Sequence, residues 1–356
     1  MAAYQGPDHV PNSSPRTTEQ LIAGATSAQG MGYGQRQARG HGYELRGLSY
    51  VPVSRLNEGR FGRMFRLPPF VPSDERIAEI AATMTENSQG PAPELDNPTI
   101  PAGYTYFGQF VDHDLTFDPV SSLDRQNDPD ALTNFRSPRF DLDSVYGRGP
   151  ADDAFLYDKT SGRVKLLIGR HDNEDDLPRN VQDTALIGDP RNDENIFVSQ
   201  LQLTMLKFHN AVVELVESDP TLRIGSENTF EAAQRIVRWH YQWIVVHDFL
   251  RRTVGAETYG EVFDESGSLP RVNRRFYQWK NDPYMPVEFS VAAYRFGHSQ
   301  VRGRYKLNTL VGPLPTFTAE SVDANPLAHF GGFRILPPFV LEVYVRFGWR
   351  GDRRGH

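Results

Sequence analysis

The alternation of apolar and polar positions predicts two long amphipathic helices in the second half of the chain, at residues 194–218 and 229–254. In both segments the apolar side chains recur three and four positions apart, which gives a helix one wide apolar face. These positions are Ile196, Leu201, Leu203, Met205, Leu206, Phe208, Val212, Val213 and Val216 in the first, and Ile236, Val237, Trp239, Trp243, Ile244, Val246, Phe249 and Leu250 in the second. Strand patterns are few and short, so we expect a mainly α fold with little β structure.

Two further helices are expected earlier in the chain. Residues 73–86 repeat apolar side chains at helical spacing, and Ser73 can cap that helix. A second helix should hold residues 105–115. By contrast, residues 137–147 resemble an acidic loop that closes on a glycine turn, and the acidic strip 171–180 has no apolar frame, which favours a solvated loop over a metal site.

The two ends of the chain lack a core pattern. Residues 1 to about 48 are rich in Gly, Ser, Gln and Arg, which predicts a flexible N-terminal arm. The glycines at 30, 32 and 34 do not form a nucleotide-binding loop, because no apolar strand precedes them. Residues 342–356 are basic and Gly-rich and read as a divergent tail.

Composition narrows the range of partners. The chain has 356 residues, of which 38% are hydrophobic and 12% aromatic, and these fractions suit a globular core. Its formal net charge is -7. A broad electrostatic surface for nucleic acid or anionic lipid is therefore not expected.

The chain contains no cysteine, which excludes disulfides, thiolate nucleophiles and zinc–thiolate sites. His, carboxylate, carbonyl and hydroxyl groups remain as candidate ligands. No transmembrane segment and no cleaved secretory signal is expected, because no window holds about 18 uninterrupted apolar residues and no basic start precedes an apolar run. A cytoplasmic location is favoured over secretion, and the pattern leaves the oligomeric state open.

The segment 105–119 concentrates candidate chemistry. It places Gln109, Asp112, His113 and Asp114 among aromatic side chains. A single His on an apolar helix is most often a packing or capping residue. Here its two carboxylate neighbours project from different sides of the helix, so the triplet can serve three environments at once. Such an arrangement suits a site where one side meets a cofactor and another a metal.

Two other clusters complete the candidate set. Arg191 lies just before the first long helix and Glu194 enters its first turn, where the plain interpretation is a capped helix with a surface salt bridge. His298 follows Gly297, whose missing side chain would let a flat group approach the backbone. Two histidines and an arginine are what peroxide chemistry at haem requires: one imidazole binds iron, a second moves the peroxide proton, and a cation stabilises charge as the O–O bond breaks.

These motifs resemble those of a known family. The distal-histidine motif of the animal-type haem peroxidases, the peroxidase–cyclooxygenase superfamily, is similar to GQFVDHDLTFDP. The sequence of this segment is most similar to that of bacterial members. FDLDSVYG resembles the calcium loop of that family, GDPRNDEN its catalytic-arginine motif and YRFGH its proximal-histidine motif. Order and spacing agree over residues 49–341, which we therefore expect to form an incomplete haem peroxidase domain.

The resemblance implies a role for each matching residue. His113 matches the distal acid–base, Arg191 the arginine that polarises peroxide, and Gln109 a glutamine that orders distal water or lies near halide. His298 matches the iron ligand of haem b. The implied reaction reduces hydrogen peroxide and oxidises a small-molecule donor or halide, as in a response to oxidative stress.

The resemblance also implies how the cofactors are held. Asp112 and Glu194 match carboxylates that form ester links to haem, Arg295 matches an arginine that pairs with a haem propionate, and Asn195 stands where one branch has a third, methionine link. The implied calcium ligands are Asp114, Ser137, Arg139 through its carbonyl, Asp141 and Asp143.

Two alternatives stay open. The superfamily includes fatty-acid oxygenases that use a tyrosine three positions before the proximal histidine, but this chain has Arg295 there, which favours a peroxidase. The family domain also continues beyond the length of this chain, so a truncated remnant that binds haem without catalysis is the other alternative. His240 and His247 share one helix face and are expected to be structural.

Overall fold

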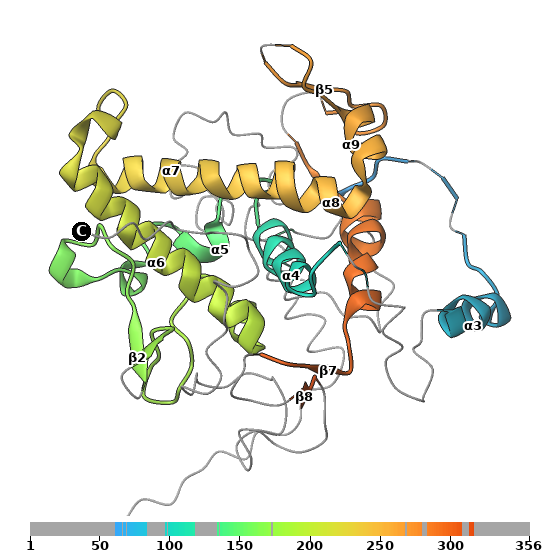
Figure 1. Ribbon diagram of the computed structural model, residues 1–356, viewed down its shortest axis with the longest axis horizontal. Coiled ribbons are helices and arrows are strands. Elements are labelled where there is room, and N and C mark those ends of the chain that lie inside the picture. Colours follow the sequence, from blue (N-terminus) through green and yellow to red (C-terminus); the bar gives the residue numbers. More distant parts are fainter. Residues whose placement is uncertain are drawn as a thin grey trace, which may run out of the picture. The chain divides into compact units, whose positions relative to one another are not determined.

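A computed structural model describes residues 61–83, 97–117 and 134–316, except positions 66, 69, 98, 135, 172–173, 268, 280–282 and 308–312. The predicted N-terminal arm at 1–48 and the basic tail at 342–356 lie outside the described residues, as do residues 317–341 of the expected domain. Figure 1 shows that helices dominate the described part, as the apolar pattern predicts.

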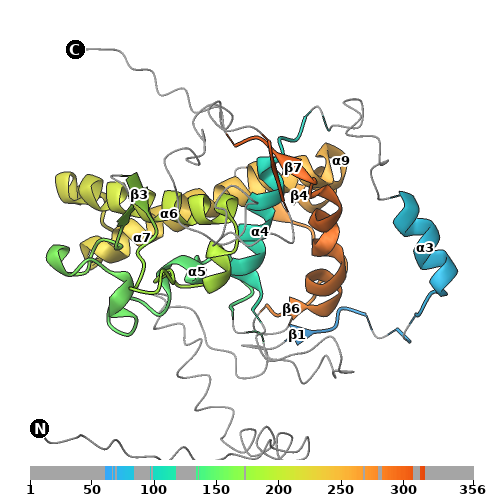
Figure 2. The same cartoon turned by 90° about the horizontal axis from the view of Figure 1, so that it is seen from below.

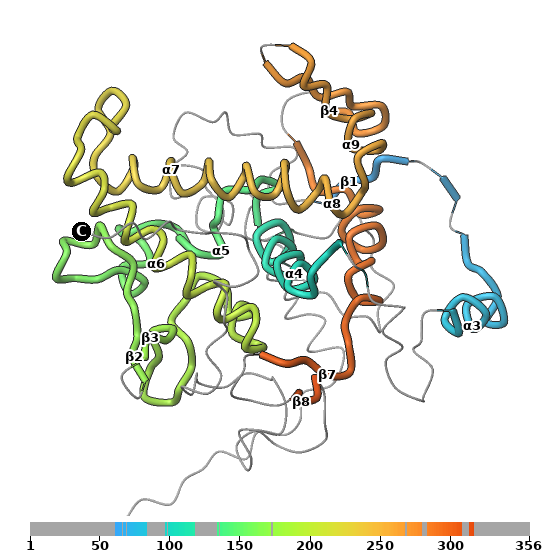
Figure 3. The backbone as a smooth tube through the Cα atoms, viewed as in Figure 1, coloured from blue at the N-terminus to red at the C-terminus, as the bar shows by residue number. Residues whose placement is uncertain are grey.

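The α-helices are α3 (Asp74–Thr83), α4 (Gly103–Leu115), α5 (Asp143–Tyr146), α6 (Ile196–Ser218), α7 (Thr229–Trp243), α8 (Arg251–Val254) and α9 (Ala256–Val262). Short 3₁₀ segments are η4 (Ala154–Leu156), η5 (Lys159–Ser161), η6 (Pro190–Asp193), η7 (Pro220–Leu222) and η10 (Ala293–Gln300). Two π-helical segments, η8 (Ile244–Leu250) and η9 (Glu288–Ala292), extend α7 and precede η10 respectively. The tube in Figure 3 follows the run from α7 through α8 into α9.

Strands are short and occur only in pairs within the described residues. They are β1 (Phe61–Gly62), β2 (Gly169–His171), β3 (Glu174–Asp176), β4 (Phe263–Asp264), β5 (Arg271–Val272), β6 (Met285–Pro286), β7 (Arg304–Tyr305) and β8 (Leu314–Pro315). The parallel pair β1–β6 matches Phe61 with Met285 and brings segments far apart in sequence side by side (Figure 2). The pairs β2–β3, β4–β5 and β7–β8 are antiparallel.

The two long helices pack against each other and form the centre of the core. Asn195 caps α6 by accepting hydrogen bonds from the backbone N–H groups of Phe197 and Val198. At the start of α7, Asn228 and Glu231 form a reciprocal capping box. The apolar face predicted for the first long helix is largely buried, with Val213 and Val216 of α6 fully enclosed. The face predicted for the second was wrong in part, because Trp239, Trp243 and Ile244 are exposed whereas Val237 and Phe249 are buried.

Helix α4 packs on α6 and on η10, and contacts η8 near its middle. Gly108 allows the last of these approaches, because a Cβ atom there would lie 3.1 Å from the ring of Phe249. Phe110 of α4 meets the ring of Tyr241 edge-on within the core. The helix that carries the His113 segment is therefore fixed from several sides.

The structure confirms the mainly α prediction and refines its details. Helix α3 covers Asp74–Thr83 of the predicted 73–86, and residues 84–86 lie outside the described residues. The second long helix changes to π geometry at Ile244. The expected loop at 171–180 was wrong in part, because its first half belongs to the β2–β3 hairpin, in which Arg170 pairs with Asp175. No described helix is long and apolar enough to cross a membrane.

A buried histidine in α6 links fold stability to pH. His209 is fully enclosed, with Nε2 2.9 Å from the carbonyl oxygen of Val164 and Nδ1 3.1 Å from the hydroxyl of Tyr146. Burial lowers the pKa of His209 from 6.5 to about 4. Between these values the unfolded chain binds a proton that the folded chain does not, so the free energy of unfolding falls as pH decreases.

We expect this group to remove up to about 3 kcal/mol of stability between neutral pH and pH 4. Urea unfolding at a series of pH values measures the slope, and the His209→Gln variant should have a flatter one whatever its absolute stability. Equal slopes for the two proteins would contradict the assignment.

Candidate functional site

One cavity gathers the residues that the sequence assigns to haem chemistry. Its volume is about 600 Å³, and it lies between α4, the η6–α6 junction, η8 and η10. Aromatic rings of Tyr104, Tyr106, Phe249, Tyr294 and Phe296 form much of its wall. The predicted haem-site residues in the lining are Gln109, Asp112, His113, Arg191, Glu194, Arg295 and His298. Aromatic walls with a few convergent polar groups are typical of a cofactor pocket.

The three consecutive polar residues of α4 face three different environments. Asp112 meets Arg295 of η10, His113 meets Asn192 of η6, and Asp114 meets the loop before α5. Successive helical residues are turned by about 100°, which explains the separation. The sequence predicted this divergence.

His113 is buried and held from behind. Its Nδ1 lies 2.7 Å from the side-chain oxygen of Asn192, and its Nε2 is 3.9 Å from a carboxylate oxygen of Glu194. Burial, together with the positive charge of Arg191, lowers the pKa of His113 to about 4, although the Asn192 hydrogen bond opposes the shift. A neutral imidazole at the wall of a cavity can accept a proton at neutral pH.

Arg191 is fixed by a fully buried carboxylate. Its Nε lies 3.1 Å from Oδ1 of Asp189 and its Nη2 2.8 Å from Oδ2. The same Nη2 donates to the carbonyl oxygens of His113 and Thr116. Burial raises the pKa of Asp189, but the hydrogen bond from Arg191 and the charge of Arg136 outweigh it and lower that pKa to about 2. The arginine is thus a fixed cation directly behind the His113 backbone.

A chain of polar side chains crosses the cavity wall beside Gln109. The side-chain amide nitrogen of Gln109 donates to Glu194, and the side-chain oxygen of Gln109 accepts from Asn195 Nδ2 at 3.1 Å. Burial raises the pKa of Glu194, against the opposing charge of Arg191. Asn195, at the position of the absent methionine link, therefore caps α6 and positions Gln109.

Asp112 is more tightly held than Glu194. Oδ2 of Asp112 accepts from Arg295 Nη1 at 2.9 Å, and Oδ1 accepts from the Thr116 hydroxyl at 3.0 Å. The side chain of Glu194 is 46% exposed, whereas that of Asp112 is 9% exposed. The two candidate ester-forming carboxylates thus differ in both burial and partners.

His298 reaches the cavity from the opposite part of the chain. Its Nδ1 lies 3.0 Å from the carbonyl oxygen of Arg295, one turn earlier in η10. Since a carbonyl can only accept, Nδ1 carries the proton and Nε2 keeps its lone pair for a ligand. Apart from its chain neighbours, no described residue lies within 4 Å of where a Cβ of Gly297 would be.

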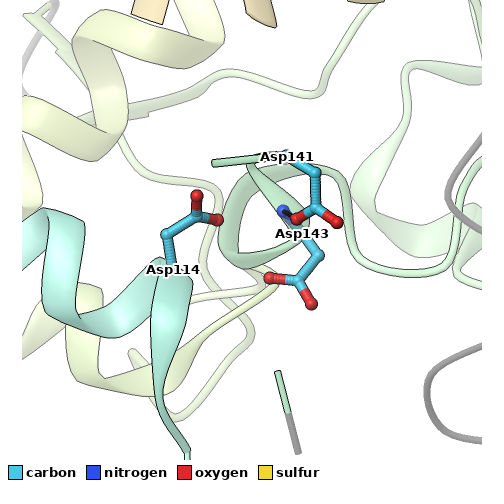
Figure 4. Close-up of side chains that lie close together, drawn as sticks. All are labelled: Asp114, Asp141 and Asp143. Carbon is cyan, nitrogen blue, oxygen red and sulfur yellow. Dashed lines mark hydrogen bonds between the residues drawn. The ribbon is translucent and has the colours of Figure 1, made fainter. Parts of the chain in front are cut away.

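A second site, the acidic cluster of Asp114, Asp141 and Asp143, is completely buried. Figure 4 shows the carboxylate of Asp114 on α4 facing those of the other two, and one oxygen from each lies within 4.8 Å of the others. Burial, and then the charges of Asp141 and Asp143, raise the pKa of Asp114 well above its usual range. Grouped carboxylates of this kind need a cation or protons for compensation.

The other predicted calcium ligands lie in the same loop. The Ser137 hydroxyl donates to Asp141 Oδ2 at 2.6 Å, and Arg139 lies between these two residues in sequence. Hard oxygen donors from carboxylates, a hydroxyl and a backbone carbonyl are the set that Ca²⁺ prefers. The donor set therefore fits calcium, with the Arg139 carbonyl as a predicted member.

Several residues that organise the site were missed by the sequence analysis. Asn192 contacts His113, Asp189 fixes Arg191, and Arg136 donates to Asp189 and to the His113 carbonyl oxygen. Asp189 had a recognisable signal, because it precedes a proline and caps η6 through the Arg191 N–H. Arg136 and Asn192 had none, since their partners lie far away in sequence.

Comparison with known proteins covers much of the described region. The family model for animal haem peroxidase matches residues 122–321, more than half of the chain. This range includes Arg191, Glu194, Arg295, His298 and the 137–143 loop, and it begins after α4. The family match therefore does not include α4, and the position of α4 against these segments is known from the structure.

Individual relatives match shorter stretches. A peroxidase-like protein from Margaritifera margaritifera is 31% identical over 137 residues, and chorion peroxidase from Drosophila melanogaster is 31% identical over 121 residues. These matches cover 35% and 34% of this chain, but only 15% and 14% of those proteins. The structure of peroxidase A from Dictyostelium discoideum superposes with a TM-score of 0.48 at 16% identity, covering 74% of this chain and 59% of that one. On the family match, this chain belongs to the animal haem peroxidases.

Proposed function

We propose that the chain is a haem-dependent peroxidase that reduces hydrogen peroxide and oxidises small electron donors. The single observation that carries this proposal is the shared cavity, in which His113, Arg191 and His298 meet although they lie far apart in sequence. Bound haem supplies the two-electron chemistry at peroxide. The protein supplies the ligand, the proton transfer and the fixed charge.

His298 is the proposed iron ligand, through Nε2. Its Nδ1 proton is directed to the Arg295 carbonyl oxygen, which leaves Nε2 as the basic nitrogen. This backbone acceptor lies in the same helical segment as the ring that it orients.

His113 is the proposed proton-transfer group. Its Nε2 takes the proton from one peroxide oxygen and returns it to the other, while Arg191 stabilises the charge that develops between them. A pKa of about 4 keeps the imidazole neutral and ready to accept at neutral pH. Asp189 fixes the guanidinium through Nε and Nη2, which leaves Nη1 as the nitrogen that would donate toward peroxide.

We propose that an ester link to haem forms more readily at Glu194 than at Asp112. Glu194 presents a partly exposed carboxylate at the cavity, whereas both oxygens of Asp112 accept hydrogen bonds from Arg295 and Thr116. A link at Asp112 would have to displace these partners, so a link at Glu194 is favoured.

Calcium is the proposed cation of the acidic cluster, where it would neutralise Asp114, Asp141 and Asp143. Because Asp114 follows His113 directly on α4, the cation would hold the helix that presents the proton-transfer group. Its proposed role is positional.

Halide oxidation is less supported than oxidation of small organic donors. Gln109, the residue implied in halide binding, has both ends of its amide engaged by Glu194 and Asn195. The carboxylate beside it also disfavours an anion.

Haem titration tests the proposal. The full chain should develop a Soret band with haem, and this band should shift on addition of hydrogen peroxide. The His298→Ala change should weaken haem binding more strongly than the loss of an outer-shell partner, which costs about 10- to 100-fold in affinity. The matched control is His240→Ala, an exposed histidine of α7 whose Nδ1 contacts the Ile236 carbonyl oxygen outside the cavity.

Equal haem affinity in both variants would contradict the iron-ligand assignment. Absence of any peroxide-dependent shift would favour a haem-binding remnant. Oxygenated products from linoleate, without peroxide-dependent donor oxidation, would favour the fatty-acid dioxygenase alternative.

A further inference from the structure

Two buried amides stand in series behind His113. The Asn192 side-chain oxygen lies 2.7 Å from His113 Nδ1, and its Nδ2 donates to the Gln202 oxygen at 2.9 Å. Asn192 and Gln202 are fully buried, and His113 is 4% exposed. Water therefore does not compete for these hydrogen bonds, and the side chains alone decide where the imidazole proton resides.

The direction of the two amides determines the tautomer of the imidazole. An amide oxygen only accepts and an amide nitrogen only donates. Because Asn192 gives its Nδ2 proton to Gln202, it presents its oxygen to His113, and Nδ1 must be the donor. The proton is then on Nδ1, and Nε2 of His113, a residue that lines the cavity, holds a lone pair. If both side-chain amides were turned by about 180°, Asn192 would present Nδ2 to His113 Nδ1, and the imidazole proton would lie on Nε2 instead.

The backbone around Asn192 is anchored independently of His113. Its N–H donates to the Asp189 carbonyl oxygen at 3.0 Å in the η6 turn. At the end of that turn, Arg179 forms a two-bonded ion pair with Asp193, at 2.7 and 2.8 Å. Gln202 comes from the second turn of α6. The backbones of both amide residues thus belong to elements whose own hydrogen bonds do not involve the imidazole.

We propose that Asn192, oriented by Gln202, is a positioning residue that holds His113 as the Nδ1–H tautomer and so makes Nε2 the proton acceptor in the cavity. The inference rests on the proposed peroxidase function for its consequence, but not for the tautomer itself. With the proton on Nε2, the ring could not accept a peroxide proton there. Without the Asn192 oxygen, nothing among its described partners would hold the proton on Nδ1.

Nitrogen NMR of the full chain with ¹⁵N-labelled histidine, before haem is added, measures the tautomer directly. We expect His113 in the unmodified chain to be protonated at Nδ1 and not at Nε2. In Asn192→Leu, which is similar in size but cannot accept, the Nε2–H form should become populated. Asn192→Asp retains an acceptor oxygen and should restore the proton on Nδ1.

The matched control is Gln200→Leu. Gln200 is also a buried amide of α6, but it is not part of the Asn192–Gln202 pair. The change therefore places a leucine in the same helix without altering either amide of that pair. This variant should keep the tautomer of the unmodified chain. A proton on Nε2 in the unmodified chain would overturn the proposal, and the measurement needs no variant to fold.

A second measurement separates this proposal from the proposed function. In haem-loaded protein, Asn192→Leu should slow the peroxide step by about 10²-fold at unchanged haem affinity, with Asn192→Asp recovering most of the rate. An unchanged tautomer in Asn192→Leu would overturn the positioning role. A chain that binds no haem but shows the expected tautomers would contradict the peroxidase function. The same result would support the role of Asn192 and Gln202 in setting the tautomer of His113.

Discussion

The His113→Ala variant is expected to react with hydrogen peroxide about 10²- to 10⁴-fold more slowly than the unmodified chain, at unchanged haem affinity. The variant removes the one imidazole that the structure holds neutral at the cavity wall, while the proposed iron ligand His298 is retained. Stopped-flow absorbance of the haem-loaded protein measures the rate, because the Soret band reports the first reaction with peroxide.

His240→Ala is again the control, since this histidine contributes nothing to the cavity lining. Its rate should equal that of the unmodified chain. A rate for His113→Ala within about twofold of the control would mean that proton transfer uses another group, because loss of general acid–base catalysis costs far more.

Removing calcium should lower the thermal stability of the chain. The three buried carboxylates of the acidic cluster would then repel one another at a site that is closed to bulk solvent. Calcium at about 100 times its dissociation constant is expected to add about 2.7 kcal/mol to the free energy of unfolding. Calorimetry in calcium and in EGTA measures the difference.

This calcium effect should shrink as pH falls. The pKa of Asp114 is raised in the metal-free folded state, so that state binds a proton more tightly than the unfolded chain does, and acid stabilises it. The same proton must leave before calcium binds. The contribution of His209 is common to both curves and cancels in the difference.

Asp143→Asn should abolish most of the calcium response. The matched control, Asp175→Asn, changes a surface carboxylate of β3 that pairs with Lys207 and should keep the full response. Equal responses in the two variants would place the cation elsewhere.

The sequence predicts those features that depend on local periodicity or on a contiguous motif. Helices α4, α6 and α7 follow from apolar spacing, and the divergence of Asp112, His113 and Asp114 follows from helix geometry. The β2–β3 hairpin was missed, because its strands carry charged side chains on both faces and lack alternating apolar positions. The π segment at Ile244 has the same apolar pattern as an α-helix and left no signal.

Tertiary partners are the part that spacing cannot supply. Asn192 lies in a run of polar residues typical of a turn, and only the approach of α4 to η6 makes it a partner of His113. Similarly, the salt bridge between Asp112 and Arg295 joins residues 183 positions apart. The resemblance placed all these segments in one domain, but the individual contacts required the fold.

Three consecutive positions of α4 face Arg295, Asn192 and the acidic cluster, and this sharing of one helix restricts how the protein can change. Gly108 seats the helix against Phe249, so a larger residue there would press on that ring and on the helix that carries all three side chains. Mutational scans of α4 should therefore show pleiotropy, with cofactor retention, peroxide reactivity and metal response declining as one trait. Variation that tunes a single property is expected instead in η10, whose Arg295 and His298 line the cavity, while the carboxylates of the acidic cluster come from α4 and the 141–143 segment.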